Sequence, residues 1–458
     1  MKRKKVHFVG IGGIGVSALA QWFFSDGWQV SGSDLESSEI TQKLESGGIK
    51  IAVGPHKSEN VPTDTKLVIY SPAANKNAEI NFAKKHKIKT RSYAEALGDV
   101  TKNKLTIAVA GSHGKSTTTA LISLILIEAG FDPTVIVGTK LREFTEPAFW
   151  REAWLSSGRS VGSNFRKGGS PIWIIEADEW KGSFWNYCPS LSVVTNIDKE
   201  HLDFYKTHAK VKNAFKKFLL NNAKGSKIII NADDKHASEV AALLAKSHPK
   251  RFSGRIHYYS LASPKAVEIM QVTAMPGKHN ASNAMAAYTV ASALNIPDDL
   301  VKRVLASFEG AWRRFERVGT INEAPVIADY AHHPTEISST IQAARARFGK
   351  KKIIVVFQPH HYERTRALFP ELQKALSLGD TVCLLDIYEV AGREKKQKDP
   401  RVHSFHLART ISENGHNSYH LPYPSQLREF LEREADADSV ILMLGAGSIW
   451  KYTKNVVQ

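Results

Sequence analysis

Short runs of consecutive apolar, often β-branched residues recur along the chain between longer mixed segments. The runs are VHFVGI, LVIYSP, LTIAVAG, PIWIIEAD, SVVTNI, KIIINAD, VIADYA, IIVVFQP, TVCLLDI and SVILMLGAG. Each is continuously apolar instead of alternating, which is typical of parallel strands covered by helices on both faces. The pattern therefore predicts an α/β protein, with helices in the segments between the runs.

Length and two polar breaks predict three domains. The chain has 458 residues, and a typical domain has roughly 150. TKNK at 101–104 and GAWRRFERVG at 310–319 each precede a fresh apolar run, so we expect domains at 1–102, 103–314 and 315–458. A Gly/Ser-rich basic segment at 156–171 predicts a flexible surface loop inside the second domain.

Composition excludes several classes of protein. No stretch approaches the roughly 20 apolar residues of a membrane helix, and the basic start MKRKK leads into a glycine-interrupted run without a cleavage site. We therefore expect a cytoplasmic protein outside the membrane. Only Cys188 and Cys383 are present, which argues against a disulfide framework and a cysteine-based metal site.

The formal charge of +17 is compatible with nucleic acid, anionic substrates or a basic proteome. The basic residues are dispersed apart from short runs such as 350–352 and 393–398. Since no basic platform is interleaved with aromatic residues, we expect no nucleic-acid partner.

The first apolar run leads into a glycine motif. Gly10, Gly12 and Gly15 have G-x-G-x-x-G spacing in HFVGIGGIGVSALA, and Asp34 closes a second predicted strand, WQVSGSD. Glycines at the start of a helix let backbone N–H groups face a diphosphate, and the acid suits a ribose hydroxyl. The alternative is that the glycines only permit a tight turn between strand and helix.

The third apolar run leads into a phosphate-loop motif of short form, AVAGSHGKSTTT. Only Ser112 and His113 separate Gly111 from Gly114 and Lys115, whereas the usual motif has four residues in that place. The glycines let N–H groups converge on phosphate oxygens, Lys115 can reach the terminal phosphate, and the neighbouring Ser116 offers a hydroxyl to Mg²⁺. A purely structural turn is the alternative.

Acidic residues follow two further predicted strands. Glu176, Asp178 and Glu179 end PIWIIEADEW, and Asp198, His201 and Asp203 follow SVVTNI. Each alone is compatible with a helix cap or a solvated residue. Because the carboxyl ends of parallel strands meet at one edge of a sheet, their joint placement predicts a metal and phosphate site there.

The ordered motifs together resemble the Mur ligase family. They are GSHGKSTTT, EADE, TNIDKEHLD, GKHNASNAMAA, WRRFE, DYAHHPTEI and FQPHHYERT, and the resemblance covers essentially the whole chain. It implies a Rossmann-like N-terminal domain, a central P-loop ATP-binding domain with a parallel sheet, and a Rossmann-like C-terminal domain. The N-terminal motifs are most like those of members that join L-alanine to UDP-N-acetylmuramate.

The resemblance implies residues for ATP and metal. Those for ATP are Gly111, Ser112, His113, Gly114, Lys115, Ser116, Thr117, His279, Asn280, Asn283, Arg314 and Asp329. Those for one or two Mg²⁺ (or Mn²⁺) ions are Ser116, Glu176 and His201.

It also implies residues for the other two substrates and for catalysis. Those for the UDP-sugar are Gly12, Gly13, Ile14, Gly15, Asp34 and Ser71, and those for the amino acid are Tyr330, His332, His361 and Arg364. The catalytic residues implied are Lys115, His201, Arg314, His332 and Arg364.

The reaction that the resemblance implies is amide formation in peptidoglycan precursor synthesis. ATP converts the lactyl carboxylate of UDP-N-acetylmuramate into an acyl phosphate, and the amine of L-alanine, deprotonated near His332, displaces phosphate. Lys115, Mg²⁺ and Arg314 neutralise the anions that must meet. Arg364 pairs with the amino-acid carboxylate. We expect a monomer or a homodimer.

Alternatives remain at this stage. The family's HRYxR pattern has arginine where this chain has His361, so glycine, L-serine or another acceptor stays open beside L-alanine. A sister ligase would attach a preformed peptide to the same UDP-sugar. A nicotinamide oxidoreductase would explain only the first motif, and a P-loop motor only the second domain. A catalytically silent relative is a further alternative, although Lys115, Glu176, His201 and Arg364 are present.

Overall fold

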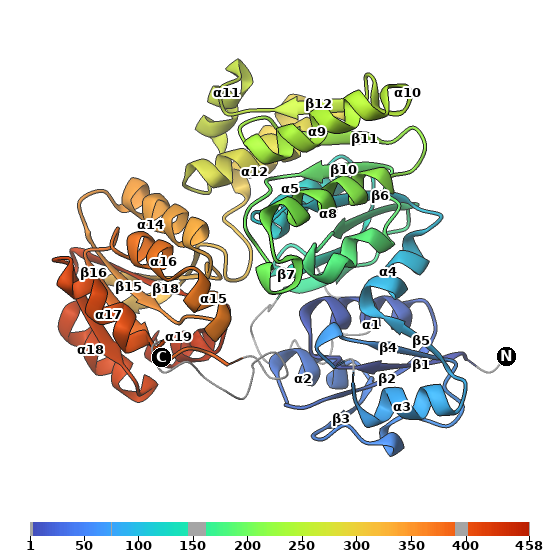
Figure 1. The fold of residues 1–458 in the computed structure, drawn as a ribbon, viewed down its shortest axis with the longest axis horizontal. Coiled ribbons are helices and arrows are strands. Elements are labelled where there is room, and N and C mark those ends of the chain that lie inside the picture. The colour runs from blue at the N-terminus through green and yellow to red at the C-terminus, as the bar shows by residue number, and fades with distance from the viewer. Residues whose placement is uncertain (1–2, 75, 145–161, 390–401, 458) are drawn as a thin grey trace. The chain divides into compact units, whose positions relative to one another are not determined.

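The structure is a computed structural model that describes residues 3–74, 76–144, 162–389 and 402–457. Within these ranges the chain forms three β-sheets with helices packed on them (Figure 1). It divides into two compact units, one comprising Met1–Val272 with Ser282–Leu305 and the other Thr273–Ala281 with Ala306–Gln458. The α/β class with mainly parallel sheets is confirmed.

The first sheet is wholly parallel, with the order β3-β2-β1-β4-β5. Its order reverses between β1 and β4, and ligands of open α/β sheets bind at such a reversal. The elements are β1 (Lys5–Val9), α1 (Ile14–Ser25), β2 (Gln29–Asp34), α2 (Glu39–Ser46), β3 (Lys50–Val53), η1 (Ser58–Asn60), β4 (Leu67–Tyr70), η2 (Pro72–Ala74), α3 (Ala78–Lys85), β5 (Lys89–Ser92) and α4 (Tyr93–Thr101).

The second sheet has seven strands in the order β12-β11-β10-β6-β9-β7-β8. Because β6 lies between β10 and β9, the loop after β6 is flanked by the carboxyl ends of both neighbours. The elements are β6 (Leu105–Ala110), α5 (Lys115–Glu128), β7 (Thr134–Leu141), β8 (Ser163–Arg166), β9 (Ile172–Glu176), η3 (Trp180–Asn186), β10 (Leu191–Val194), α7 (Leu202–Tyr205), α8 (His208–Leu220), β11 (Lys227–Asn231), α9 (Lys235–Ser247), α10 (Pro249–Phe252), β12 (Ile256–Tyr259), α11 (Pro264–Val272), α12 (Lys278–Ala293) and α13 (Asp298–Ser307).

The surface loop expected at 156–171 is wrong at 163–166, whereas 167–171 form no helix or strand. Ser163–Arg166 form β8, which pairs antiparallel with β7, and Phe165 is fully buried in the core. A four-residue strand with polar members has no apolar run, which is why the pattern missed it. Residues 156–161 lie outside the described part of the chain.

The first two sheets share one hydrophobic core. Helix α1 packs between them, so that Leu19 and Phe23 belong to the same buried cluster as Ile175 of β9. Trp22 of α1 meets Trp173 of β9 edge to face, with ring centroids 5.5 Å apart. The glycine loop before α1 is therefore attached to the second sheet as well as to the first.

The other unit holds the third sheet, with the order β13-β14-β18-β15-β16-β17. Only β13 is antiparallel to its neighbour among these strands. Val355 and Ile354 of β15 enter two different buried clusters, one on each face. Strands covered on both faces need apolar residues at every position, which explains their continuous runs.

The elements of this unit follow the same strand-helix alternation. They are β13 (Glu316–Ile321), β14 (Ala324–Asp329), α14 (Pro334–Phe348), β15 (Lys352–Phe357), α15 (Tyr362–Ala367), α16 (Phe369–Leu376), β16 (Thr381–Leu385), α17 (Ser404–Glu413), β17 (Asn417–Leu421), η4 (Pro424–Gln426), α18 (Leu427–Glu434), β18 (Ser439–Leu444) and α19 (Ile449–Val457).

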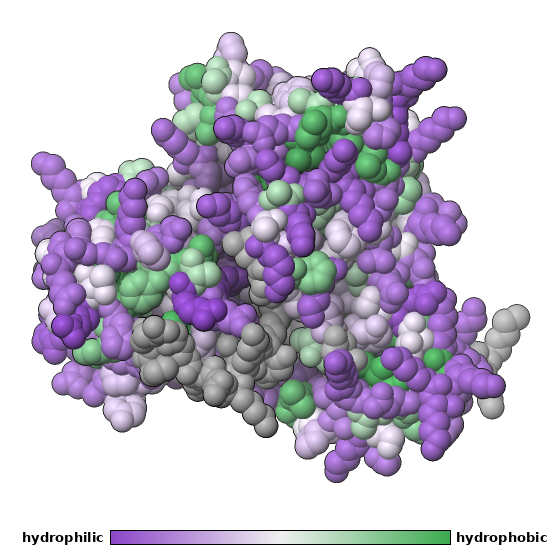
Figure 2. Space-filling view, viewed as in Figure 1, coloured by the Kyte–Doolittle hydropathy of each residue, from purple (hydrophilic) through white to green (hydrophobic). Residues whose placement is uncertain are grey.

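The surface agrees with the composition. The face drawn in Figure 2 is mainly hydrophilic, with apolar residues in small separate areas. In the described ranges, no helix combines the length and the apolar character that crossing a membrane requires. Cys188 and Cys383 are free thiols.

Candidate active site

The phosphate loop joins β6 to α5 in a conformation that requires its glycines. Gly111 has φ +144° and Gly114 has φ +80°. A Cβ on Gly111 would lie 1.9 Å from Thr195 Oγ1, and one on Gly114 would lie 2.3 Å from Asn283 Oδ1. Both positions thus combine a backbone that disfavours side chains with a neighbour that excludes them.

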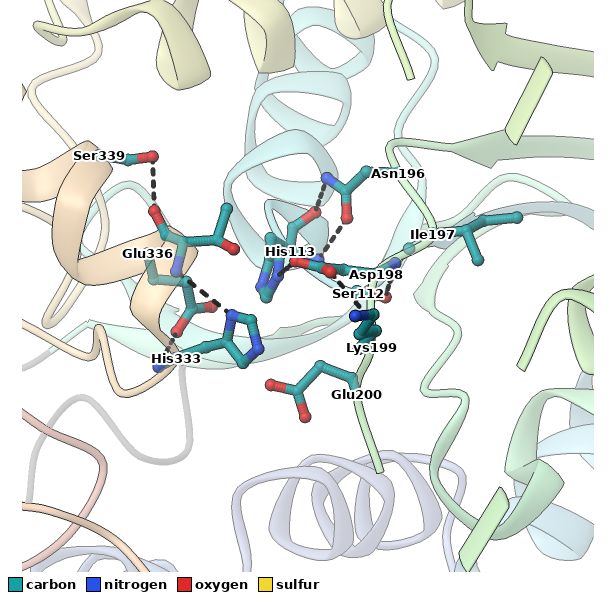
Figure 3. Close-up of polar contacts among 12 residues, drawn as sticks. Ser112, His113, Asn196, Ile197, Asp198, Lys199, Glu200, His333, Glu336 and Ser339 are labelled. Atoms are coloured by element: carbon teal, nitrogen blue, oxygen red, sulfur yellow. Dashed lines mark hydrogen bonds and ion pairs between the residues drawn. The ribbon is translucent and has the colours of Figure 1, made fainter. Parts of the chain in front are cut away.

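The segment after β10 holds this short loop in place. The side chain of Asn196 binds both backbone groups of His113. Its Oδ1 accepts from the His113 N–H at 2.8 Å, and its Nδ2 donates to the His113 carbonyl at 3.1 Å. Thr195 Oγ1 donates to the same carbonyl at 2.6 Å. His113 Nε2 lies 3.0 Å from Asp198 Oδ2, and Figure 3 shows the two side chains pointing toward each other.

The start of α5 is arranged to bind an anion. Gly114 is the N-cap residue and supplies no side chain to the N–H groups of the first turn. Such groups, together with the helix dipole, favour phosphate at this end. The loop N–H groups of Ser112 and His113 already bond to Asn196. The first turn of α5 is consequently the main source of backbone donors for a phosphate.

Lys115 lies at the centre of an acidic group. Its Nζ is 2.9 Å from Glu179 Oε2, and the Glu179 side chain is 1% exposed. Burial alone would lower the pKa of Lys115, but the carboxylates of Glu179, Asp178 and Glu176 outweigh burial and raise this pKa above its ordinary value. Lys115 therefore remains a cation, as phosphate binding requires.

Ser116 and Glu176 form the hard oxygen pair that the sequence predicts for magnesium. Ser116 Oγ donates to Glu176 Oε1 at 3.1 Å, and Glu176 Oε2 accepts from the Gly138 N–H of β7 at 2.9 Å. A hydroxyl and a carboxylate beside a phosphate site are suitable ligands for Mg²⁺. The residues present thus fit the predicted cation.

His201 lies beside a different carboxylate from the one expected. Its Nε2 is 3.5 Å from Glu179 Oε1, and the ligand atoms of Asp178, Glu179 and His201 all lie within 4.8 Å of one another. His201 has φ +54°, which a side chain rarely adopts. The acids after β9 therefore divide into Glu176 beside Ser116 and Glu179 between Lys115 and His201.

The glycine motif of the first sheet forms the expected turn. The Gly12 N–H donates to Asp34 Oδ2 at 2.8 Å, so this acid braces the loop. A Cβ added to Gly10 would lie 2.9 Å from Ser71 Cβ, and one added to Gly15 would lie 2.8 Å from Tyr93 Cζ. Gly13 and Ile14 cap and begin α1.

Asn164 of β8 ties the start of α1 to the second sheet. Its Nδ2 donates to the Ile14 carbonyl and, at 2.9 Å, to Ser17 Oγ. Its Oδ1 accepts from Gln21 Nε2 at 3.0 Å. The side chain is buried, and both of its polar atoms bond to this helix.

The predicted adenine residues lie on α12. Asn283 Oδ1 accepts from Thr118 of α5 at 3.2 Å. In the other unit, Asn280 Nδ2 donates to the Pro276 carbonyl at 2.8 Å. Burial, with a smaller contribution from Arg314, lowers the pKa of His279 to about 4 against the effect of Glu336.

Arginine and tyrosine gather at the end of β14 in the other unit. The guanidinium groups of Arg313 and Arg314 lie 4.8 and 5.1 Å from the Tyr330 ring centroid. Asp329 accepts from the N–H groups of Phe315 and Ala331, at 2.7 and 2.8 Å. Its carboxylate thus fixes the residue before β13 and the turn after β14.

His332 faces two acceptors through Nδ1. Glu336 Oε2 lies at 3.2 Å and the Tyr330 carbonyl at 3.1 Å. Both require a proton on Nδ1, so the neutral ring has its lone pair on Nε2. Such a ring is suited to accept a proton at Nε2.

The HHYER segment begins α15. His360 stacks on Tyr388 with centroids 5.5 Å apart. His361, the N-cap residue, is buried with φ +82°, and its N–H donates to the Tyr388 carbonyl at 3.0 Å. Arg364 follows within α15, at the same carboxyl edge of the third sheet as His332.

Sequence reasoning missed several residues of these sites. Asn196 and Asn164 act on loops more than 80 residues away in sequence, and Tyr388 pairs with His360 through an isolated bridge. The only available signal was that Thr195 and Asn196 directly precede the acids of TNIDKEHLD. Glu179 was noticed as an acid but given no role of its own.

The phosphate loop, whose shape depends on its glycines, lies at the carboxyl edge of a mainly parallel sheet, next to Lys115, Ser116 and Glu176. These features define a nucleotide-binding α/β protein. Family models for the Mur ligase catalytic, middle and glutamate ligase domains match residues 5–105, 109–291 and 313–447. The chain belongs to the Mur ligase family, which confirms the resemblance seen in its motifs.

The relatives include UDP-N-acetylmuramate--L-alanine ligases. The chain is 37% identical to that of Geobacter sp. over 98% of its length and 96% of the relative's, and 35% identical to that of Aquifex aeolicus over 99% and 97%. The solved UDP-N-acetylmuramate-alanine ligase of Thermotoga maritima is 27% identical, with a TM-score of 0.78 and coverage of 99% and 98%. The murein peptide ligase of Psychrobacter arcticus, 21% identical with a TM-score of 0.66 and coverage of 99% and 100%, shares the fold.

Proposed function

We propose that the protein is an ATP-dependent ligase that joins L-alanine to UDP-N-acetylmuramate, with release of ADP and phosphate, in peptidoglycan precursor synthesis. One observation carries the proposal: a charged Lys115 and the Ser116–Glu176 pair lie together where the phosphate loop meets the carboxyl end of β9. The likeness to L-alanine ligases over 98% of the chain supports the choice of substrates. We further propose a cytoplasmic enzyme that is a monomer or a homodimer, with the domain limits given above.

In the proposed reaction, Lys115 and the first turn of α5 bind the phosphates of ATP. Ser116, Glu176 and His201 would hold Mg²⁺ or Mn²⁺, which would neutralise phosphate charge when bound. The lactyl carboxylate attacks the terminal phosphorus and ADP leaves, which gives an acyl phosphate. Fixed positive charge in a site that excludes water favours the approach of the lactyl carboxylate to the ATP phosphate.

The second step forms the amide bond. The amine of the amino acid attacks the acyl carbon, His332 Nε2 takes its proton, and the tetrahedral intermediate expels phosphate. Arg364 and His361 are proposed to bind the amino-acid carboxylate, and Arg314 the nucleotide phosphates. His279, Asn280 and Asn283 are proposed for the adenine of ATP, and Asp329 is proposed as a further ATP-binding residue.

The UDP-sugar is proposed to bind at the Gly12–Gly15 loop and Ser71. The reversal of strand order between β1 and β4 lies here, and the uncapped N-terminus of α1 suits a diphosphate. Asp34 is proposed to act by fixing the loop through Gly12.

Phosphate release from ATP and Mg²⁺ tests the proposal. It is measured with and without UDP-N-acetylmuramate, against L-alanine, glycine, L-serine and a tripeptide. We expect release only when both the UDP-sugar and L-alanine are present. Release with another acceptor would make His361 a specificity residue, whereas release that ignores the UDP-sugar would overturn the ligase assignment.

A further inference from the structure

The three protons of the Lys115 ammonium group are all engaged by oxygen atoms of the protein. Nζ lies 2.6 Å from the Gly111 carbonyl, 3.2 Å from the Ser112 carbonyl and 2.9 Å from Glu179 Oε2. An ammonium group has three donors and no more. A phosphate oxygen can therefore bind Lys115 only when one of these three acceptors gives way.

Glu179 is the acceptor that can leave. The two carbonyls belong to the phosphate loop, which Thr195 and Asn196 hold in place. The Glu179 backbone is also fixed, because its carbonyl accepts from the Tyr205 hydroxyl and from the Gly182 N–H. The Glu179 side chain, in contrast, reaches Lys115 through two methylene groups, so a change of rotamer releases the lysine without moving the backbone.

The surroundings of the second carboxylate oxygen of Glu179 indicate where the side chain can move. Among the described residues, Oε1 has no hydrogen-bond partner although it is fully buried, and it lies 3.5 Å from His201 Nε2. A buried acceptor without a partner is unfavourable. An acceptor facing an imidazole in this way indicates a missing partner, and a divalent cation bound with His201 would supply it.

We propose that Glu179 is an internal stand-in for the ATP phosphate: it holds Lys115 while the site is empty and transfers to a cation on the His201 side when nucleotide binds. The inference rests on the proposed function, since it takes ATP as the ligand. Phosphate frees Glu179 for the cation, and the cation draws Glu179 away from Lys115. Each ligand thus assists the other, and this coupling is reciprocal.

The test is the affinity for ATP of the full-length protein in EDTA and in Mg²⁺, measured by calorimetry for wild type and Glu179→Gln. Glutamine keeps the shape but removes the competing charge. We expect the variant to bind ATP about tenfold more tightly in EDTA, which corresponds to about 1.4 kcal/mol. Addition of Mg²⁺ should then improve its affinity less than it improves that of wild type.

Asp178→Asn is the matched control. It removes the same charge from the adjacent acid, which acts on Lys115 only through space. Equal tightening in both variants would show a general field effect and overturn the inference, as would an unchanged affinity in Glu179→Gln. If Glu179→Gln fails to fold, Glu179→Asp, which is one methylene too short to reach Lys115, should show the same tightening in EDTA.

The same measurement separates this inference from the proposed function. Wild-type protein that binds no ATP even in Mg²⁺ would contradict an ATP-dependent ligase, and the stand-in role with it. ATP binding in wild type without tightening in Glu179→Gln would overturn the stand-in role alone.

Discussion

Glu79 shows how one buried side chain organises the first sheet. This residue of α3 is fully buried. One oxygen accepts from Ser33 at 2.6 Å and faces His7 Nε2 at 3.2 Å, while the other accepts from Asn60 at 2.7 Å and faces His56 at 3.1 Å. Burial would raise the pKa of Glu79, but hydrogen bonds from His7, Ser33 and Asn60 outweigh it and lower the pKa to about 2.

We expect Glu79→Gln to destabilise the protein by about 3 kcal/mol at neutral pH, because it leaves paired buried groups without their charge partner. The pKa in the folded protein is below the ordinary value of 4.5, so the stabilisation is complete above that pH and is lost as pH falls toward about 2. Urea unfolding of wild type and variant between pH 3 and 7 measures this. Glu45→Gln on the exposed face of α2 is the control, and a constant difference across that range would contradict the assignment.

At the scale of the element, α5 offers a comparison between its two ends. Gly114 begins the helix at φ +80°, and Gly130 follows its end at φ +79°. An added Cβ would meet Asn283 at 2.3 Å in the first case and nothing within 4 Å in the second. Both glycines thus have a left-handed backbone, but only Gly114 has a neighbour that would collide with an added side chain.

Gly130→Ala should cost about 1–2 kcal/mol of stability through its left-handed backbone and leave the KM for ATP unchanged. Gly114→Ala should show the same strain and, in addition, lose ATP binding, because the loop must shift away from Asn283. Thermal unfolding and ATP titration of both variants separate the two effects. Equal ATP affinity in the two variants would show that the Gly114 contact is unimportant for the phosphate site.

The sequence predicts an element well where the pattern that indicates it lies within one strand or one loop. The continuous runs of β6, β15 and β18 follow from coverage on both faces, and the loop of Gly111–Thr117 follows from its own spacing. β8 was not predicted, because its burial comes from contacts with β7 and α1 rather than from its own composition. Likewise, the carboxylates could be placed at one edge, but which of them faces Lys115 depends on the turn after β9.

At the scale of the molecule, the described structure joins the first two sheets into one unit. Asn164 is the polar part of this connection and the core around Trp22 and Trp173 is the apolar part. The sequence indicated separate domains at 1–102 and 103–314, and these limits remain a prediction. Polar residues that link two sheets leave no periodic pattern, so the sequence could not indicate the connection.

Asn164→Ala should therefore affect the UDP-sugar more than ATP. The change removes one buried partner each from the Ile14 carbonyl, Ser17 Oγ and Gln21 Nε2, which should cost about 2 kcal/mol and loosen the start of α1. We expect a several-fold higher KM for UDP-N-acetylmuramate and an unchanged KM for ATP in steady-state kinetics. Arg166→Ala in the same strand, whose side chain contacts Asp132 and Pro133 instead, is the control. A parallel rise of both KM values would contradict this role.

The attachment of the short phosphate loop has a consequence for protein engineering. Gly111–Thr117 is held by hydrogen bonds from Thr195 and Asn196 and packs at Gly114 against Asn283, which also binds the next residue, Thr118; these three residues come from two other segments of the chain. Transplanting those seven residues alone onto the sheet of an unrelated protein should therefore give a loop without a defined shape. A functional graft would have to carry all three segments. A search for this kind of site in new sequences should likewise be more specific when it requires the three segments together.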